Sequence, residues 1–153
     1  VESVTKYITR ACLEMRVCFT VWQEPQGKAR PKFAKRERYV SVRTPEKTRA
    51  YEKSIQEAYL QQCGNQTCLE GGSVEMKVTA YFKIPKSASK NKRQAMLLGE
   101  IRPTKKPDAD NILKAVADAL NGVAYKDDAC VVKMDVEKFY ADVGRIDVVV
   151  ESF

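Results

Sequence analysis

The clearest pattern of hydrophobic and polar positions lies in residues 74–84, where the two kinds of side chain alternate. Every second position is apolar, namely Val74, Met76, Val78, Ala80, Phe82 and Ile84. Because successive side chains of a strand point to opposite faces, this alternation predicts a β-strand with one buried face. The half-solvated character of such a strand favours an antiparallel partner.

Shorter runs of the same kind predict four more strands. They cover residues 15–22, 39–43, 131–139 and 145–151. The last two are joined by five residues that include Gly144, so we expect them to pair as a β-hairpin. Residues 25–38 are rich in Lys and Arg, and we expect a basic loop there.

Three segments have the spacing of helices. We expect them to run from residue 44 to 64, from 87 or 89 to 99, and from about 110 to 121. The first opens with Thr44 as the expected cap and Pro45 at the first helical position. The third has Leu113, Val116 and Leu120 on one apolar stripe.

The mixed order of strands and helices predicts a single α+β domain, with a mixed, mostly antiparallel sheet and helices packed on it. A chain of 153 residues has the size of one domain. Residues 1–14 read poorly as part of it, and we expect a leader or tag followed by a domain of residues 15–153. No apolar run approaches the roughly 20 residues of a membrane-spanning helix, so no membrane partner is expected.

The charge of the chain indicates a polyanionic partner. The net charge is +7, and basic residues concentrate in residues 28–43 (seven against one acid) and 83–106 (eight against one acid). Two solvated loops would also carry such charges. We favour two phosphate-contacting patches, because the acids concentrate elsewhere. The DNA-binding candidates are Lys28, Arg30, Lys32, Lys105 and Lys106.

The five cysteines form no framework. Cys63 and Cys68 stand five positions apart, and the chain has no histidine to complete a zinc site. A disulfide between these two stays open, although free thiols in a reducing cytosol are the expectation.

Acidic side chains gather at Asp108, Asp110, Asp127 and Asp128. In a helix the first two would point about 200° apart, so they share a site only if Asp108 lies in extended residues, which Pro107 favours. Capping or a turn explains each acid singly. Together they leave four carboxylates in one region of a cationic chain, and this fits Mg²⁺, which prefers oxygen ligands.

Because the chain lacks histidine, the commonest general base is absent, and a metal-activated water is the expected nucleophile. Lys114 follows Asp110 by four positions and shares its helix face. It could simply neutralise that acid, but we favour a catalytic cation that stabilises charge on a phosphate. Trp22, Phe33 and Tyr39 could stack on opened bases, with packing inside the protein as the more common role.

The segments that carry these residues resemble the RusA family of Holliday junction resolvases. They are Lys106-Pro107-Asp108-Ala109-Asp110-Asn111-Ile112-Leu113-Lys114-Ala115, Asp118-Ala119-Leu120-Asn121-Gly122 and Tyr125-Lys126-Asp127-Asp128. Residues 27–31 and 44–52 also resemble the family's N-terminal half, and the resemblance extends from about residue 15 to the end. Residues 86–102 are an insertion relative to shorter members.

The resemblance implies a RusA-like fold and assigns roles by position. Asp108, Asp110 and Asp128 match catalytic Mg²⁺ ligands, Lys114 matches a lysine needed for cleavage, and Asp127 is a further candidate ligand. Mg²⁺ is the implied cofactor, with Mn²⁺ as a substitute. The implied enzyme is a homodimer that nicks four-way DNA junctions in two strands, in the bacterial cytoplasm and encoded by a phage or prophage.

Two other functions stay open. One is a non-catalytic nucleic-acid-binding protein whose acids are caps and turns, and Mg²⁺-dependent nicking that Asp→Asn variants lose would exclude it. The other is a less selective Mg²⁺ nuclease, which would cut linear duplex as readily as junctions.

Overall fold

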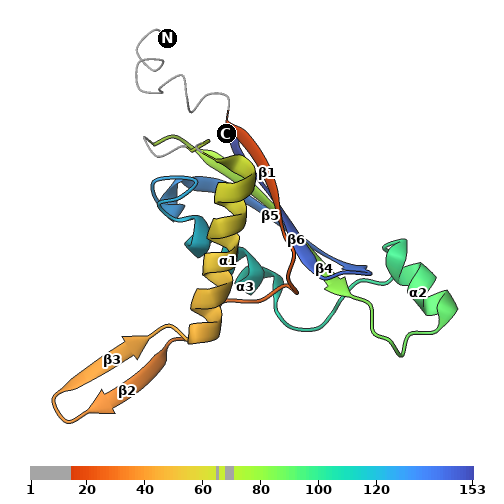
Figure 1. The fold of residues 1–153 in the computed structure, drawn as a ribbon, viewed down its shortest axis with the longest axis horizontal. Helices are drawn as coiled ribbons and strands as arrows, with labels where there is room; N and C mark the ends of the chain where they lie inside the picture. Colours follow the sequence, from red (N-terminus) through yellow and green to blue (C-terminus); the bar gives the residue numbers. More distant parts are fainter. Residues whose placement is uncertain (1–14, 65, 68–70) are drawn as a thin grey trace, which may run out of the picture.

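The computed structural model describes residues 15–153 except 65 and 68–70, and it leaves out the side chains of residues 34–36. The expected leader or tag, residues 1–14, lies outside the described residues. The described elements are β1 (Arg16–Val21), β2 (Lys32–Arg36), β3 (Tyr39–Arg43), α1 (Glu46–Cys63), β4 (Val74–Lys83), α2 (Lys90–Leu97), α3 (Ala109–Leu120), a short 3-10 helix (Asp128–Cys130), β5 (Val131–Ala141) and β6 (Arg145–Ser152) (Figure 1).

The main sheet has four strands in the order β1-β6-β4-β5. β6 pairs antiparallel with both β1 and β4, whereas β4 pairs parallel with β5. The expected antiparallel partner of β4 is therefore present, on one of its two edges. The α+β class and the mixed, mostly antiparallel sheet are confirmed.

The expected hairpin of β5 and β6 is wrong, because β4 lies between them. The two strands are therefore about 10 Å apart, twice the spacing of neighbouring strands. Residues 142–144 can span that distance. They cross the end of β4, where the Ile84 amide donates a hydrogen bond to the Ala141 carbonyl at 3.0 Å. The short link between β5 and β6 correctly predicted that these strands run in opposite directions, but it could not predict that β4 lies between them.

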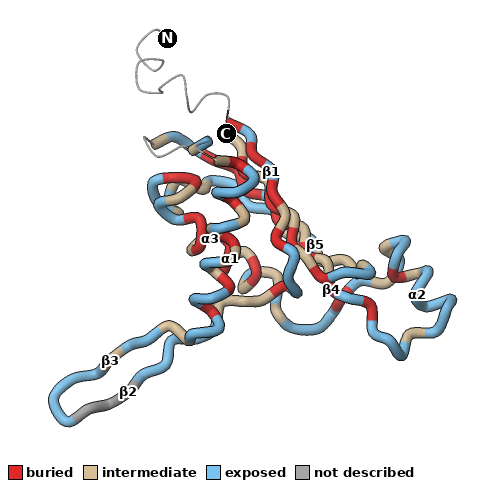
Figure 2. The backbone as a smooth tube through the Cα atoms, in the orientation of Figure 1, coloured by how far each residue is buried: buried red, intermediate tan, exposed pale blue. Residues whose placement is uncertain are grey.

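Helices α1 and α3 cover one face of the sheet, and the core lies between these two layers (Figures 1 and 2). The apolar residues of β4 from Val74 to Phe82 are buried, as their alternation predicted. From α1, Tyr59 is completely buried and its ring meets that of Phe19 edge-on, with ring centroids 5.5 Å apart. On the other face of the sheet Glu75 is buried too, and Lys133 pairs with it at 2.9 Å.

Part of the expected basic loop is a strand. Within residues 25–38, β2 pairs antiparallel with β3, and the resulting hairpin projects from the body (Figure 1). The expected cap of the following helix is also wrong by one position, since Pro45 is the cap and α1 begins at Glu46. Its expected end is confirmed, because Gly64 follows Cys63 with a φ of 61°.

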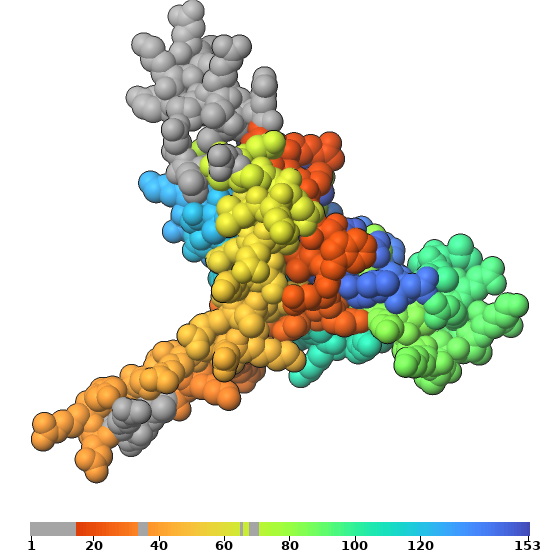
Figure 3. Space-filling model, in the orientation of Figure 1, coloured from red at the N-terminus to blue at the C-terminus, as the bar shows by residue number. Residues whose placement is uncertain are grey.

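Residues 86–102, which the resemblance led us to expect as an insertion, form α2 and its flanking loops, which project on the opposite side from the β2–β3 hairpin (Figure 3). Ser89 caps α2 by accepting a hydrogen bond from the Lys92 amide at 3.3 Å. Arg102 ties the segment to β5, since its Nε donates to the Lys138 carbonyl at 2.6 Å.

In the part of the chain that the structure describes, no helix has the length and apolar character needed to cross a membrane. Cys63 carries a free thiol, and Cys68 lies outside the described residues, so the disulfide that the sequence left open is not described.

Candidate active site

Helix α3 carries a stripe of charged residues opposite its buried face. Asp110, Lys114 and Asp118 are four positions apart, so they follow one another along one side of the helix. The buried side includes Ile112 and Val116. Packing of these two against the core therefore turns the charged stripe outward, where Asp110 and Lys114 are exposed.

Asp108 lies in extended backbone directly before α3, with φ −68° and ψ 152°. This confirms the expectation that Asp108 lies in extended residues before the helix. The Asp108 side chain makes no capping hydrogen bond, although Asp108 holds the cap position. Among the described residues, the side chains of Asp108 and Asp110 have no hydrogen-bond or ion-pair partner. Capping thus leaves both carboxylates unexplained.

Asp127 and Asp128 have different surroundings. The Asp127 side chain accepts a hydrogen bond from the Ala129 amide at 2.8 Å and so caps the 3-10 helix that follows. That hydrogen bond is the main reason why the pKa of Asp127 is lowered. Asp128 instead lies 3.3 Å from the Lys114 Nζ. The local structure therefore occupies Asp127 and directs Asp128 toward the α3 stripe.

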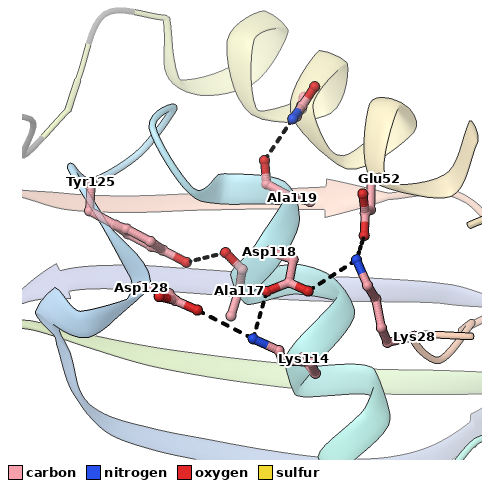
Figure 4. Close-up of polar contacts among 9 residues, drawn as sticks. Lys28, Glu52, Lys114, Ala117, Asp118, Ala119, Tyr125 and Asp128 are labelled. Carbon is pink, nitrogen blue, oxygen red and sulfur yellow. Dashed lines mark hydrogen bonds and ion pairs between the residues drawn. The ribbon is translucent and has the colours of Figure 1, made fainter. Parts of the chain in front are cut away.

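Lys114 lies between two acids (Figure 4). Its Nζ is 2.8 Å from Asp118 and 3.3 Å from Asp128. The hydrogen bond to Asp118 is the largest of the effects that raise the pKa of Lys114, so the side chain keeps its charge at neutral pH. Neutralisation of Asp110 by Lys114, the alternative that the sequence left open, is not seen among the described residues, because Lys114 contacts Asp118 and Asp128 instead.

Lys28 is also held by acids and does not extend into solvent. Its Nζ contacts Glu52 of α1 and lies 3.0 Å from Asp118 of α3 (Figure 4). Burial lowers the pKa of Lys28, but the hydrogen bonds to Glu52 and Asp118 outweigh it and raise the pKa overall. The sequence did not predict the contact with Glu52, because no local pattern marks that residue. It also gave no role to Asp118, although the four-residue spacing from Lys114 could have indicated their contact.

Tyr125 attaches the loop that carries Asp128 to the end of α3. Its side chain is completely buried, and its hydroxyl donates to the Ala117 carbonyl at 2.7 Å. The Gly122 amide, at a φ of 73°, donates back to the Tyr125 carbonyl at 2.9 Å. Burial, followed by the charges of Asp128 and Asp118, raises the pKa of Tyr125, which therefore stays neutral.

A cleft of about 620 Å³ opens beside Asp108. Its lining is rich in cations, with Lys28, Arg30, Lys32, Lys47 and Lys106 around the single acid Asp108. Arg30, Lys32 and Lys106 were expected to contact DNA, and Lys47 was missed because it lies in α1. Lys105 does not line the cleft, since its Nζ lies over the Phe82 ring, 5.6 Å from the ring centroid.

Gly27 lets the wall of the cleft pack closely against the start of α3. A Cβ at this position would lie 3.0 Å from the Cβ atoms of both Asn111 and Pro107. The next residue donates its amide to the Asn111 carbonyl at 3.2 Å. Backbone contact therefore fixes the loop that bears Lys28 and Arg30.

A Mg²⁺ site requires several oxygen ligands around one point. Among the described residues, no three side chains of the Asp, Glu, Cys or His types lie close enough together to hold a metal ion. The chemistry of the donors nevertheless fits, because Asp108 and Asp110 offer unpartnered carboxylates and Asp128 lies on the side of α3 that carries Lys114. The three expected ligands thus lie at the start and on the charged side of one helix, but the described structure does not gather them into one cluster.

Comparison with known proteins identifies the family of this chain. The chain is 40% identical over 136 residues to "Uncharacterized protein YqaN" of Bacillus subtilis (strain 168), and the match covers 88% of this chain and 94% of that protein. The profile of the family described as "Endodeoxyribonuclease RusA" matches residues 23–151, which include the charged stripe, the cleft and both projections. This chain therefore belongs to the RusA family of endodeoxyribonucleases.

Proposed function

We propose that this protein is a structure-selective endodeoxyribonuclease that resolves four-way (Holliday) junctions by paired, Mg²⁺-dependent hydrolysis of phosphodiesters. The observation that carries the proposal is the charged stripe of α3. Asp110, Lys114 and Asp118 share one face, Asp128 meets Lys114, and Asp108 stands at the mouth of a cationic cleft. Membership of the family supports the nuclease activity.

Asp108, Asp110 and Asp128 would hold Mg²⁺, with Mn²⁺ as a substitute. When bound, the ion would offset the charge of the three acids and withdraw electrons from a phosphate oxygen. We assign Asp127 to the cap of the 3-10 helix and not to the ligand set, because its carboxylate already accepts the Ala129 amide.

Lys114 acts on the phosphate in this proposal. Asp118 and Asp128 hold its ammonium in place and keep it charged. A fixed cation stabilises the negative charge that develops on the phosphate oxygens during hydrolysis. Because Lys114 stays protonated, it serves as this cation and not as a general base.

The cleft binds the DNA backbone next to the cleavage point. Arg30, Lys32, Lys47 and Lys106 supply the phosphate contacts, and each contact releases a counterion. Lys105, outside the cleft, would contact a phosphate further along the strand. Because the proposed substrate is DNA, we propose that the enzyme acts in the bacterial cytoplasm, and encoding by a phage or prophage stays a prediction.

A homodimer would supply two matched nicks, since each chain has one such site and a closed dimer repeats it by symmetry. Strand β4 and helix α3 bury their apolar faces in the chain's own core. The interface therefore needs other apolar surface, and Val132 and Met134 on the edge strand β5 are exposed by 55% and 43%. A mass of one 17.3 kDa chain by light scattering at micromolar concentration, with and without junction DNA, would contradict the dimer.

Nicking of a labelled four-way junction tests the proposal. Asp110→Asn should slow nicking by more than the roughly 10- to 100-fold typical of changes to the partners of metal ligands. The matched control is Asp135→Asn, an exposed aspartate on β5, which should cut at the wild-type rate. Mg²⁺ or Mn²⁺ should support nicking, and EDTA should stop it.

Three results would contradict the proposal. Binding without any nicking would indicate a non-catalytic binding protein. Equal cutting of linear duplex would indicate the less selective nuclease. Normal nicking by Asp110→Asn would show that the ligand assignment is wrong.

A further inference from the structure

The β2–β3 hairpin is a separate arm of the molecule. Its strands pair with each other over five residues each and project away from the sheet and helices (Figures 1 and 3). A lone two-stranded ribbon is marginally stable at best in water. An arm that receives so little support from the core is well suited to gain its order from a partner.

The register divides the arm into two chemically different faces. Phe33 lies opposite Val42, and Val40 is two positions along on the same face. These three side chains are exposed by 71%, 57% and 58%. Lys32 lies opposite Arg43 on the other face. By register Lys35 also falls on the first face, opposite Val40. The ribbon thus presents one face with three exposed apolar side chains beside a lysine position, and a second face with the pair of Lys32 and Arg43.

Charge identifies the kind of partner. Residues 28–43 carry seven basic residues against one acid, so a second copy of this arm would meet strong like-charge repulsion. A polyanion meets no such penalty. Lys32, the first residue of β2, also lines the cleft that contains Asp108. DNA held in that cleft therefore continues onto the arm.

The apolar face narrows the choice among forms of DNA. A linear duplex presents phosphates and groove edges, whereas the faces of its base pairs are stacked on each other. Exposed or easily unstacked base faces occur where strands branch, and apolar side chains bind such faces by stacking or wedging. A ribbon that combines exposed apolar side chains with basic residues can contact both the base faces and the phosphates at a branch point.

We propose that the β2–β3 hairpin enters the centre of branched DNA, with Phe33, Val40 and Val42 against base faces at the branch point and Lys32 and Arg43 on phosphates. The arm then provides the preference for branched over linear DNA, and the α3 site provides hydrolysis. This inference rests on the proposed function, because it assumes that branched DNA is the substrate.

The test is a binding experiment without divalent metal, so that cleavage is not needed. A four-way junction carries 2-aminopurine beside the branch point, and its fluorescence rises when the base unstacks. Phe33→Ala combined with Val42→Ala should abolish the rise and weaken junction affinity about tenfold, within the range for loss of one stacking side chain. Affinity for a linear duplex of equal length should change less than about twofold.

The matched control is Leu60→Ala, which removes an exposed apolar side chain from α1 and should bind like wild type. Thermal unfolding should be unchanged in all variants, because the arm stands outside the core. Three results for the double variant would overturn the inference. Its fluorescence rise could equal that of wild type, or its affinity could fall equally for the junction and the duplex. It could also change its oligomeric mass while it keeps the wild-type preference for junctions. Wild-type protein that binds the junction through the arm but never nicks it would instead refute the proposed hydrolysis alone.

Discussion

Replacement of Lys28 by Met tests whether this lysine is a structural cation or a phosphate contact. Its Nζ contacts Glu52 and lies 3.0 Å from Asp118, and the three side chains are 25%, 19% and 20% exposed. Met keeps most of the apolar stem but removes the charge. Two partly buried carboxylates, one on α1 and one on α3, then lose the cation that they share.

The size of the effect follows from this geometry. A partly buried polar group left without its partner costs about 1–3 kcal/mol. Glu52 and Asp118 retain some contact with water, and Asp118 keeps Lys114. We therefore expect Lys28→Met to lower the free energy of unfolding by about 2 kcal/mol. In a domain of this size that lowers Tm by roughly 4–8 °C.

Urea unfolding followed by circular dichroism at pH 7 gives the measurement. The control is Arg30→Met in the same loop, whose side chain is exposed and which should change stability by less than about 0.5 kcal/mol. A double-mutant cycle of Lys28→Met with Glu52→Gln should give a coupling energy of at least about 0.5 kcal/mol. For DNA binding we expect the opposite ranking of Lys28→Met and Arg30→Met. Arg30→Met should reduce the slope of log affinity against log salt concentration by about 0.9, whereas Lys28→Met should leave this slope unchanged.

The pH dependence has a defined sign. The pKa of Lys28 is raised above 10.5, so its stabilising contribution is fully present below that value and is lost as pH rises through the raised pKa. Wild type and Lys28→Met should therefore converge only in strongly alkaline solution. Equal stability of Lys28→Met and Arg30→Met at pH 7, or a reduced salt slope for Lys28→Met, would refute the structural role.

Three further predictions follow from the site and the arm. Asp127→Ala should lower the free energy of unfolding in urea by about 1 kcal/mol, because the cap is lost. The Mg²⁺ concentration for half-maximal nicking should stay the same, and a large increase in that concentration would indicate that Asp127 is a ligand. Gly27→Ala should slow nicking without loss of fold, because the added Cβ would lie 3.0 Å from the Cβ of Asn111. If the variant kept the wild-type kcat, the close approach at Gly27 would be unimportant for activity. Lys32→Gln with Arg43→Gln should reduce the salt slope of junction binding by about 1.8, and an unchanged slope would place both side chains away from phosphates.

Local sequence patterns predicted the features that depend on neighbours in the chain. The alternation of residues 74–84 predicted the buried face of β4, because a strand repeats every two residues. The expected position of Asp108 before the helix is confirmed, and Pro107 limits how far α3 could extend toward the N-terminus, because the residue before a proline disfavours the helical conformation. The spacing of Asp110 and Lys114 predicted a shared helix face, because a helix repeats every 3.6 residues.

Other features depend on contacts between distant segments, and only the tertiary structure decided them. The backbone hydrogen bonds of a sheet carry no side-chain identity, so the sequence could not show that β4 lies between β5 and β6. The contact of Asp128 with Lys114 depends on where the Tyr125 loop meets α3, whereas the capping bond of Asp127 is local. Lys28 and Glu52 are 24 positions apart, and they meet because the loop of Lys28 is bonded to the start of α3, which packs beside α1. The chain thus determines by itself which residues face inward and which acids precede a helix, whereas the packing of helices on the sheet determines which charges meet.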